Sequence, residues 1–150
     1  MTMTAMDGTV ATLARYPIKG LSAEPLHTVN LTEGQGFPFD RVFGFARPQA
    51  ECDAADPKPM RKGNFYMLAR DAALAALEVR VDPDSQVMTL TNGAGSQEFA
   101  LDTQAGAAAA EEAIAAHLDL PAERRPRLLK GRSHRFTDVS VVSETFMHAV

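Results

Sequence analysis

The amino-acid sequence predicts a mainly β fold of the α+β class, built from short antiparallel meanders and one Ala-rich helix. Short segments rich in β-branched residues alternate with turn-forming Gly, Pro, Asp and Asn residues, which is the pattern of consecutive hairpins. A single segment, at about 103–118, has the composition and length of a regular helix. With 150 residues, 45% hydrophobic and 23% charged, the chain is long enough to bury one core, so we expect a single domain over residues 1–150.

The first third of the chain predicts three strands after a loose N-terminus at residues 1–7. The segment "GTVATLARYPI" is predicted to be a strand that ends at Pro17, because proline donates no backbone hydrogen bond. Two more strands are predicted at "LHTVNLT" (26–32), whose alternation shifts at a bulge, and at "RVFGFAR" (41–47). The short turns "KGLSAEP" and "EGQGFPFD" between them predict one antiparallel meander.

The middle of the chain predicts a loop, a short helix and a second meander. The segment "PQAECDAADPKPMRKG" (48–63) holds three of the nine prolines and few apolar residues, so we expect a surface loop. Asp71 is placed to cap a short helix near 71–77. The segments "LEVRV", "VMTLTN" and "QEFALD" are separated by the turn sequences "DPDSQ" and "NGAGS", and they predict three further strands.

The last third predicts the main helix and two more strands. Asp102 or Thr103 is the expected N-cap of the helix at about 103–118, and Pro121 closes its far end. The apolar stripe expected to face the sheet comprises Ala110, Ile114, Ala115 and Leu118. Strands are predicted within "RPRLLKG" and "DVSVVS", and Ser143 is the expected cap of a helix that begins close to the end of the sequence.

The composition excludes several classes of protein. Cys52 is the one cysteine, which excludes an intrachain disulfide and a cysteine-rich zinc site, and its acidic neighbours oppose thiolate formation. The four histidines lack metal-ligand spacing, and no phosphate-binding glycine loop or nucleophile elbow is present, so we predict no metal site and no self-contained catalytic site. The sequence has neither a signal-peptide pattern nor an apolar run of membrane-spanning length, which predicts a cytoplasmic protein.

Charge is segregated along the sequence. The net charge is −4, yet "RRPRLLKGRSHR" (124–135) holds six of the 15 basic residues and no acidic one. This segment is either part of an electropositive edge that attracts a small anion or the solvated rim of a strand. The acidic balance of the rest of the chain argues against nucleic acid as the partner.

Lys19 and Arg41 are the two cations that the predicted topology brings together. A lysine in the turn after one strand and an arginine at the start of the next strand but one lie at the same end of an antiparallel meander. With the backbone N–H of Gly20 they would form a small phosphate site, in which lysine is a point charge and arginine a two-pronged donor. The alternative is that Asp40 pairs with a nearby cation while Lys19 extends its ammonium group into solvent.

The stretch "VATLARYPIKGLSAEPLHTVNLTEGQGFPFDRVFGFA", followed by "FTDVSVVS", resembles the N-terminal β-barrel domain of MOSC (molybdenum cofactor sulfurase C-terminal) proteins. The mitochondrial amidoxime-reducing component belongs to that family. The resemblance implies a partly open β-barrel in which Lys19 of Y-P-x-K, Gly20 and Arg41 of D-R hold the phosphate of a molybdenum pyranopterin cofactor. Some relatives carry serine where Gly20 stands, so only the backbone contributes at this position.

The resemblance also implies what this sequence lacks. In the family a larger MOSC domain follows and carries the molybdenum-ligating cysteine, which Cys52 does not match in position or surroundings. Residues 137–150 would then be the start of a truncated or missing MOSC domain. We expect a stand-alone module, non-catalytic by itself, whose ligand is the cofactor phosphate or another small anion and whose partner is a MOSC-domain protein.

Two other functions compete with this expectation. In the first, the chain is part of a molybdenum enzyme, a reductase of N-hydroxylated compounds or a sulfur carrier, completed by a separate MOSC chain. In the second, the chain is a structural or protein-interaction barrel whose anion site has decayed.

Overall fold

The computed structural model describes residues 7–53, 55 and 60–131. Within them, eight strands form three sheets beside a single α-helix, and no sheet closes into a full barrel. The expectation of a partly open, mainly β fold is therefore confirmed. The predicted strand "DVSVVS", the helix at Ser143 and the 137–150 segment lie outside the described residues.

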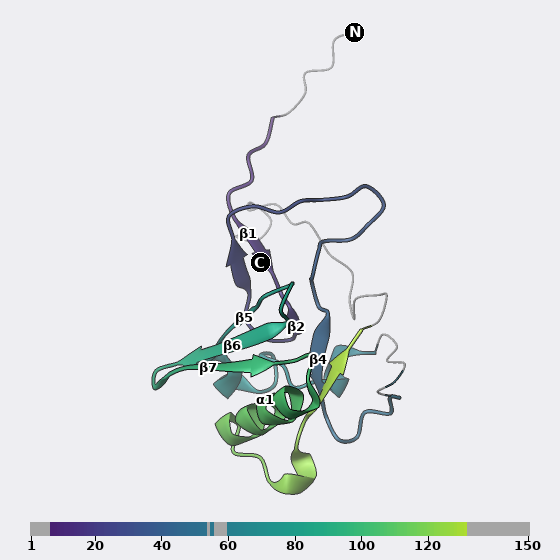
Figure 1. Cartoon of the computed structure of the whole chain (residues 1–150), viewed down its shortest axis with the longest axis vertical. Helices are drawn as coiled ribbons and strands as arrows, with labels where there is room; N and C mark the ends of the chain where they lie inside the picture. The colour runs from purple at the N-terminus through teal and green to yellow at the C-terminus, as the bar shows by residue number, and fades with distance from the viewer. Residues whose placement is uncertain (1–6, 54, 56–59, 132–150) are drawn as a thin grey trace.

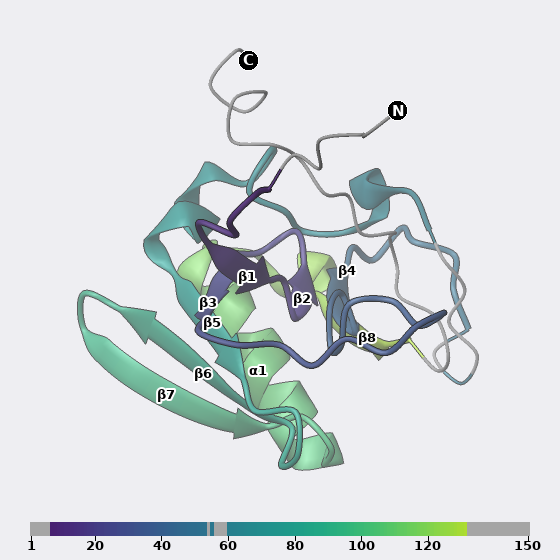
Figure 2. The ribbon, with the colours of Figure 1, turned by 90° about the horizontal axis from the view of Figure 1, so that it is seen from above.

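The central and C-terminal elements follow the sequence pattern. Strands β5 (Glu78–Val81), β6 (Val87–Asn92) and β7 (Gly95–Ala100) form an antiparallel meander, as predicted, and α1 (Gln104–His117) packs against β7 (Figure 1). Thr103 is the N-cap of α1, and its hydroxyl accepts a hydrogen bond from the Gly106 backbone N–H at 3.0 Å. Figure 2 shows β6 and β7 extending together as a curved hairpin to one side of α1.

The first predicted meander is wrong in its pairing. Before Pro17 the predicted first strand is reduced to β1 (Leu13–Arg15), and a second strand, β2 (Ile18–Lys19), follows Pro17 and includes the first residue of the predicted turn. Strand β3 (Glu24–Leu26) returns antiparallel on β1, whereas β2 lies parallel to β4 (Phe43–Ala46). Most of the predicted strand 26–32 is irregular, and the long connection from β3 to β4 allows the parallel pairing that a short turn forbids.

Strand β8 completes the middle sheet. It spans Arg127–Lys130, inside the predicted segment "RPRLLKG", and pairs antiparallel with β4 in the order β2-β4-β8. The remaining elements are three 3-10 helices: η1 (Lys62–Asn64), η2 (Ala72–Ala76) and η3 (Ala122–Arg124). The predicted short helix near 71–77 is confirmed as η2, although Asp71 makes no side-chain cap there.

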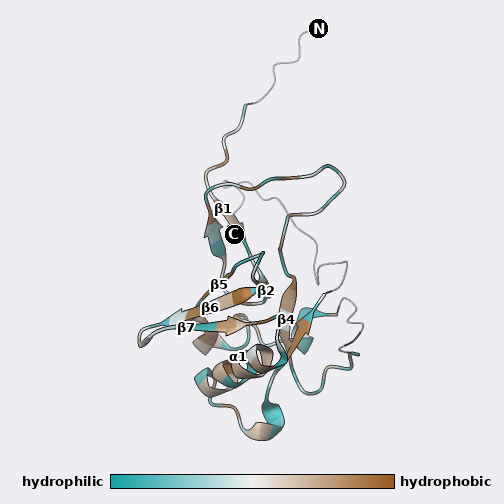
Figure 3. Cartoon of the chain, viewed as in Figure 1, coloured by the Kyte–Doolittle hydropathy of each residue, from teal (hydrophilic) through white to brown (hydrophobic). Residues whose placement is uncertain are grey.

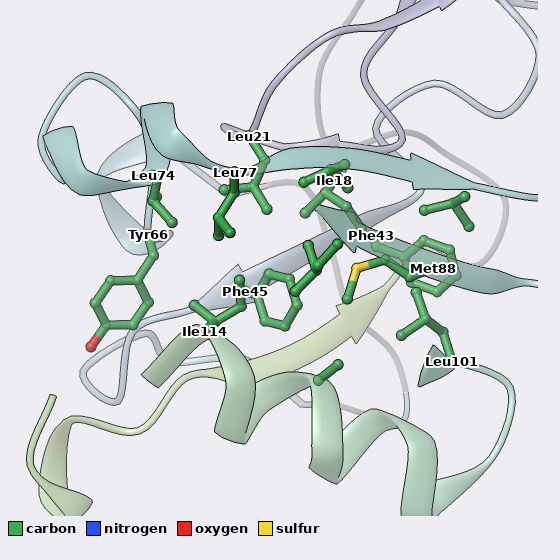
Figure 4. Packing of buried hydrophobic residues seen from close by; sticks show 14 residues of the cluster. Ile18, Leu21, Phe43, Phe45, Tyr66, Leu74, Leu77, Met88, Leu101 and Ile114 are labelled. Atoms are coloured by element: carbon green, nitrogen blue, oxygen red, sulfur yellow. The ribbon is translucent and has the colours of Figure 1, made fainter. Parts of the chain in front are cut away.

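One main core joins β2, β4, η2, the meander and α1. Apolar side chains from β2, β4, the meander and α1 meet between the sheets, as Figure 4 shows for Phe43, Phe45, Met88 and Ile114. The buried members are Ile18, Leu21, Phe43, Phe45, Tyr66, Leu74, Leu77, Val79, Val81, Met88, Leu90, Leu101, Ala110 and Ile114. Figure 3 shows hydrophobic residues in brown along β4 and β6 and hydrophilic residues in teal at η3. Burial of this apolar surface is the main force that holds the sheets together.

Candidate functional site

A pocket of about 350 Å³ lies where the turn after β2 meets the segment that follows η1. Three of its described lining residues are basic and none is acidic. The lining residues are Tyr16, Lys19, Gly20, Leu21, Arg41, Lys62, Phe65, Met67, Leu68 and Ala69. All three residues that the sequence predicted as a phosphate site, Lys19, Gly20 and Arg41, line this one pocket.

Parallel pairing, and not the predicted antiparallel return, brings Lys19 and Arg41 together. In the β2–β4 register Lys19 lies opposite Gly44. Two backbone hydrogen bonds extend this pairing toward the pocket, from Arg41 N to the Tyr16 carbonyl at 2.6 Å and from Phe43 N to the Pro17 carbonyl at 3.1 Å. Arg41 thus lies beside Tyr16, just before β2, whereas Lys19 is at the far end of β2. Both cations line the pocket, but the prediction that they lie at the same end of an antiparallel meander is wrong.

Lys19 is buried, with 4% of its surface exposed. Its ammonium donates a hydrogen bond to the Met60 carbonyl at 3.1 Å and lies 5.1 Å from the centre of the Phe65 ring. Burial, and secondarily the positive charge of Arg41, hold the pKa of Lys19 below its ordinary value. The alternative in which Lys19 extends into solvent is wrong.

The Phe65 ring that contacts Lys19 packs against the backbone of Gly44. A Cβ atom added to Gly44 would lie 2.5 Å from Phe65 Cε1, a separation that real Cβ atoms do not show. Because Lys19 is the register partner of Gly44, the bare backbone of β4 lets the ring lie beside Lys19. Gly44 thus shapes the pocket without lining it.

Arg41 is held by its own neighbours. Its Nη1 donates to Asp40 Oδ2, and its guanidinium lies 4.6 Å from the centre of the Tyr16 ring. Asp40 is 2% exposed, and its Oδ1 accepts the Tyr16 backbone N–H at 2.8 Å. The predicted pairing of Asp40 with a nearby cation is therefore correct. Arg41 has a φ of 49°, a left-handed conformation that is strained for a bulky side chain and is often found at functional sites.

Gly20 is required by the backbone at this point. Its φ is 83°, and a Cβ atom there would lie 2.6 Å from Met67 Cβ. The Gly20 carbonyl accepts a hydrogen bond from Leu68 N at 2.8 Å, which joins the two sides of the pocket. A serine at this position would clash with Met67, so this pocket offers a ligand only the backbone of Gly20.

Lys62 is the pocket cation that the sequence did not reveal. It lies in η1, in the segment predicted to be only a surface loop, and its side chain is exposed at the pocket. A signal was available in "GNFYML", where consecutive apolar residues at 65–68 mark the point at which the loop returns to the core.

The basic stretch at 124–135 does not join the pocket in its described part. Arg125 pairs with Glu111 and Glu112 of α1 at 3.7 Å and 3.1 Å, and Arg127 donates to the Ala50 carbonyl at 2.8 Å. Lys130 donates to Gln86 Oε1 at 2.7 Å. These side chains hold β8 and η3 to their neighbours, and the part of the stretch beyond residue 131 lies outside the described residues.

The described residues place no metal-ligating group in the pocket. No cluster of three or more His, Cys, Asp or Glu side chains suited to a metal ion occurs among them. Cys52 packs against the separate small cluster of Ala46, Ala50, Phe65 and Leu129, and its thiol donates to the Asp53 carbonyl at 3.6 Å. None of the helices in the described segments is long and apolar enough to cross a bilayer.

Comparison with known families gives a match that covers most of the chain. A family model described as the MOSC N-terminal beta barrel domain matches residues 7–126, which is most of the chain and includes every residue that lines the pocket. No curated protein and no solved structure gives a match.

Proposed function

The chain belongs to the family of MOSC N-terminal β-barrel domains, and on that premise we propose that its pocket binds the phosphate of a molybdenum pyranopterin cofactor, or a comparable small anion. The observation that carries the proposal is the cluster of Lys19, Arg41 and Lys62 around one pocket whose described lining has no acidic side chain. Positive charges placed together destabilise one another, and burial of Lys19 adds a desolvation cost. An anion bound between them relieves both effects.

Each residue has a distinct part in this proposal. Arg41 offers a guanidinium already fixed by Asp40 and Tyr16, so little conformational freedom is lost when it binds an oxygen atom. Lys19 supplies a point charge seated on the Phe65 ring. Lys62 is exposed and contacts the anion from the opposite side of the pocket. The backbone of Gly20 lets the chain approach the ligand closely.

The residues fit one end of the cofactor. Three cations and a glycine backbone suit a phosphate group, whereas Cys52 is not among the lining residues and offers no thiolate to the pocket. A bound cofactor would supply the molybdenum at which a substrate is reduced, and this chain would hold its phosphate. We therefore propose that a MOSC domain provides the metal-ligating half and that the module has no catalytic activity alone.

Isothermal titration of inorganic phosphate and of a simple phosphomonoester tests the proposal. Lys19→Met removes the charge and keeps the length of the side chain, so we expect at least about tenfold weaker binding than in the unaltered protein. Lys130→Met is the matched control, because it makes the same change in net charge on a lysine bonded to Gln86 outside the pocket. Equal losses in the two variants would mean that only the overall charge matters, which would contradict the proposal.

A structural role is the competing function, and a specific observation favours it. Lys19 and Arg41 both already have partners in the protein, the Met60 carbonyl and the Asp40 carboxylate. If these contacts are the sole reason for the two cations, the unaltered protein will bind neither phosphate nor the phosphomonoester in the same titration. That outcome would leave a protein-interaction or scaffolding domain as the better description.

A further inference from the structure

The far side of the pocket is an irregular segment, residues 62–69, here called the wall segment. Half of the lining residues belong to it, and the facing side is formed by residues 16–21 and Arg41. Apart from η1 and one isolated bridge between Ala46 and Phe65, it has no regular structure of its own. Its position is therefore set by contacts with other parts of the chain.

Backbone hydrogen bonds attach the wall segment on both sides. Toward β4, Arg47 N donates to the Asn64 carbonyl at 2.7 Å and Tyr66 N donates to the Phe45 carbonyl at 2.9 Å. Toward β2, Leu68 N donates to the Gly20 carbonyl at 2.8 Å. The segment thus bridges the two strands whose pairing forms the other side of the pocket.

A partly buried ion pair that does not line the pocket fixes the same segment. Arg47 is 9% exposed, and its Nε donates to the Phe65 carbonyl at 3.1 Å while its Nη2 donates to Asp71 Oδ2 at 2.5 Å. Asp71 Oδ2 also accepts the Met67 backbone N–H at 2.9 Å. The pair is therefore hydrogen-bonded to the backbone of Phe65 and of Met67, and both of these residues line the pocket.

The ring of Tyr66, the residue between Phe65 and Met67, makes a further contact with Arg47. The Arg47 guanidinium lies 4.3 Å from the centre of the Tyr66 ring, and Tyr66 itself is buried at the edge of the main core (Figure 4). The Tyr66 hydroxyl donates to the Arg124 carbonyl in η3. Arg47 is thus held by a carboxylate, a carbonyl and a ring, which leaves it a single orientation.

We propose that Arg47 and Asp71 act as a positioning pair, which sets the separation between the wall segment and the Lys19–Arg41 side and so determines how tightly the pocket holds a phosphate group. This inference rests on the proposed function of the pocket. An ion pair that is largely removed from water adds little stability, because desolvation offsets the attraction, so the value of this pair lies in fixed geometry. Displacement of a binding residue by about 1 Å is enough to weaken a site.

The signs of two single substitutions distinguish positioning from simple electrostatics. Arg47→Met removes a positive charge and Asp71→Asn removes a negative one, so an electrostatic role would make the first weaken phosphate binding and the second strengthen it. Positioning instead makes both weaken it, each by about fivefold, and makes the double variant no weaker than the worse single one. Arg125→Met is the matched control, since Arg125 pairs with Glu111 and Glu112 outside the pocket.

The measurement is titration of inorganic phosphate into the full chain, with thermal melting of each variant to establish that it is folded. If Arg47→Met does not fold, Asp71→Asn decides by itself, because the two roles predict opposite signs for it. Unchanged or tighter binding in Asp71→Asn overturns the inference while leaving the proposed function intact. Absence of phosphate binding in the unaltered protein overturns the proposed function, and the inference with it.

Discussion

Two regions of this molecule bury different kinds of side chain. The meander region, residues 72–118, contains η2, β5, β6, β7 and α1, and its buried side chains are all apolar. The pocket region, residues 13–71, contains every buried charged residue of the described chain, namely Lys19, Glu24, Asp40 and Arg47. The meander region therefore stabilises the fold by apolar burial alone, while the pocket region also buries charged groups, whose value under the proposed function is in binding.

The two regions also differ in where residues with positive φ are found. In the pocket region, Phe39 and Arg41 have positive φ values inside the connection that leads to β4, beside the proposed anion site. In the meander region, Gln86 with positive φ is in an ordinary hairpin turn. Strained backbone is typical of binding sites, and it persists there because contacts made by the rest of the fold compensate for its cost.

The largest expected effect is a loss of stability caused by a substitution in the meander region. Ile114 is fully buried against the core, so Ile114→Ala leaves a cavity and is expected to lower the free energy of unfolding by about 2–5 kcal/mol. Phosphate affinity of the folded variant is expected to stay unchanged, since no residue of this region lines the pocket. Urea denaturation and titration measure the two quantities. A fall in affinity in a folded Ile114→Ala protein would show that the regions are coupled.

A smaller stability effect is expected from Asp40 in the pocket region. Asp40→Ala removes the acceptor of the Tyr16 N–H and the partner of Arg41, and we expect a loss of about 2–3 kcal/mol. Asp40→Asn keeps an oxygen for the Tyr16 N–H and is expected to lose only about half as much. Equal losses in the two variants, measured by urea denaturation, would mean that the ion pair with Arg41 dominates.

Sequence reasoning succeeded in the meander region because local patterns determine it. The alternation of exposed and buried residues in β5, Glu78–Val81, is the alternation visible in the sequence, and the turn residues between the strands are equally explicit. The predicted helix at about 103–118 is observed as Gln104–His117 with Thr103 as its cap. Each of these features depends on residues close together in the chain.

The pocket region depends on long-range pairing that no local pattern shows. Pro17 was correctly predicted to end a strand, but nothing nearby indicates that Ile18–Lys19 then pairs in parallel with β4. Asp71 was predicted as a helix cap from its position, whereas its carboxylate pairs with Arg47 across 24 residues. Lys62 was missed because its loop is placed by the bridge from Ala46 to Phe65. The sequence motifs predicted that Lys19, Gly20 and Arg41 meet in one pocket, and only the tertiary structure shows how.

The smallest stability effect, and the one with the most specific pH dependence, is expected from Lys19. Burial and the charge of Arg41 depress the pKa of this lysine, so at neutral pH the folded state keeps a charge that the unfolded chain accommodates more easily. Lys19→Met removes that cost together with the bond to the Met60 carbonyl, and we expect stability at pH 7 to change by less than about 1 kcal/mol.

The pH dependence follows from the sign of the pKa shift. As pH rises through the depressed pKa toward the ordinary value of 10.5, the folded state loses its proton before the unfolded state does, so the unaltered protein gains stability relative to Lys19→Met. Sulfate affinity falls over the same window because the ammonium charge is lost, and sulfate itself does not titrate there. Paired urea denaturation and sulfate titration between about pH 7 and pH 10 measure both trends. The differences in unfolding free energy and in sulfate affinity between the two proteins could instead stay constant across that range. That result would mean that the fold does not lower the pKa of Lys19, and the contrast between the two regions would lose this buried cation as its example.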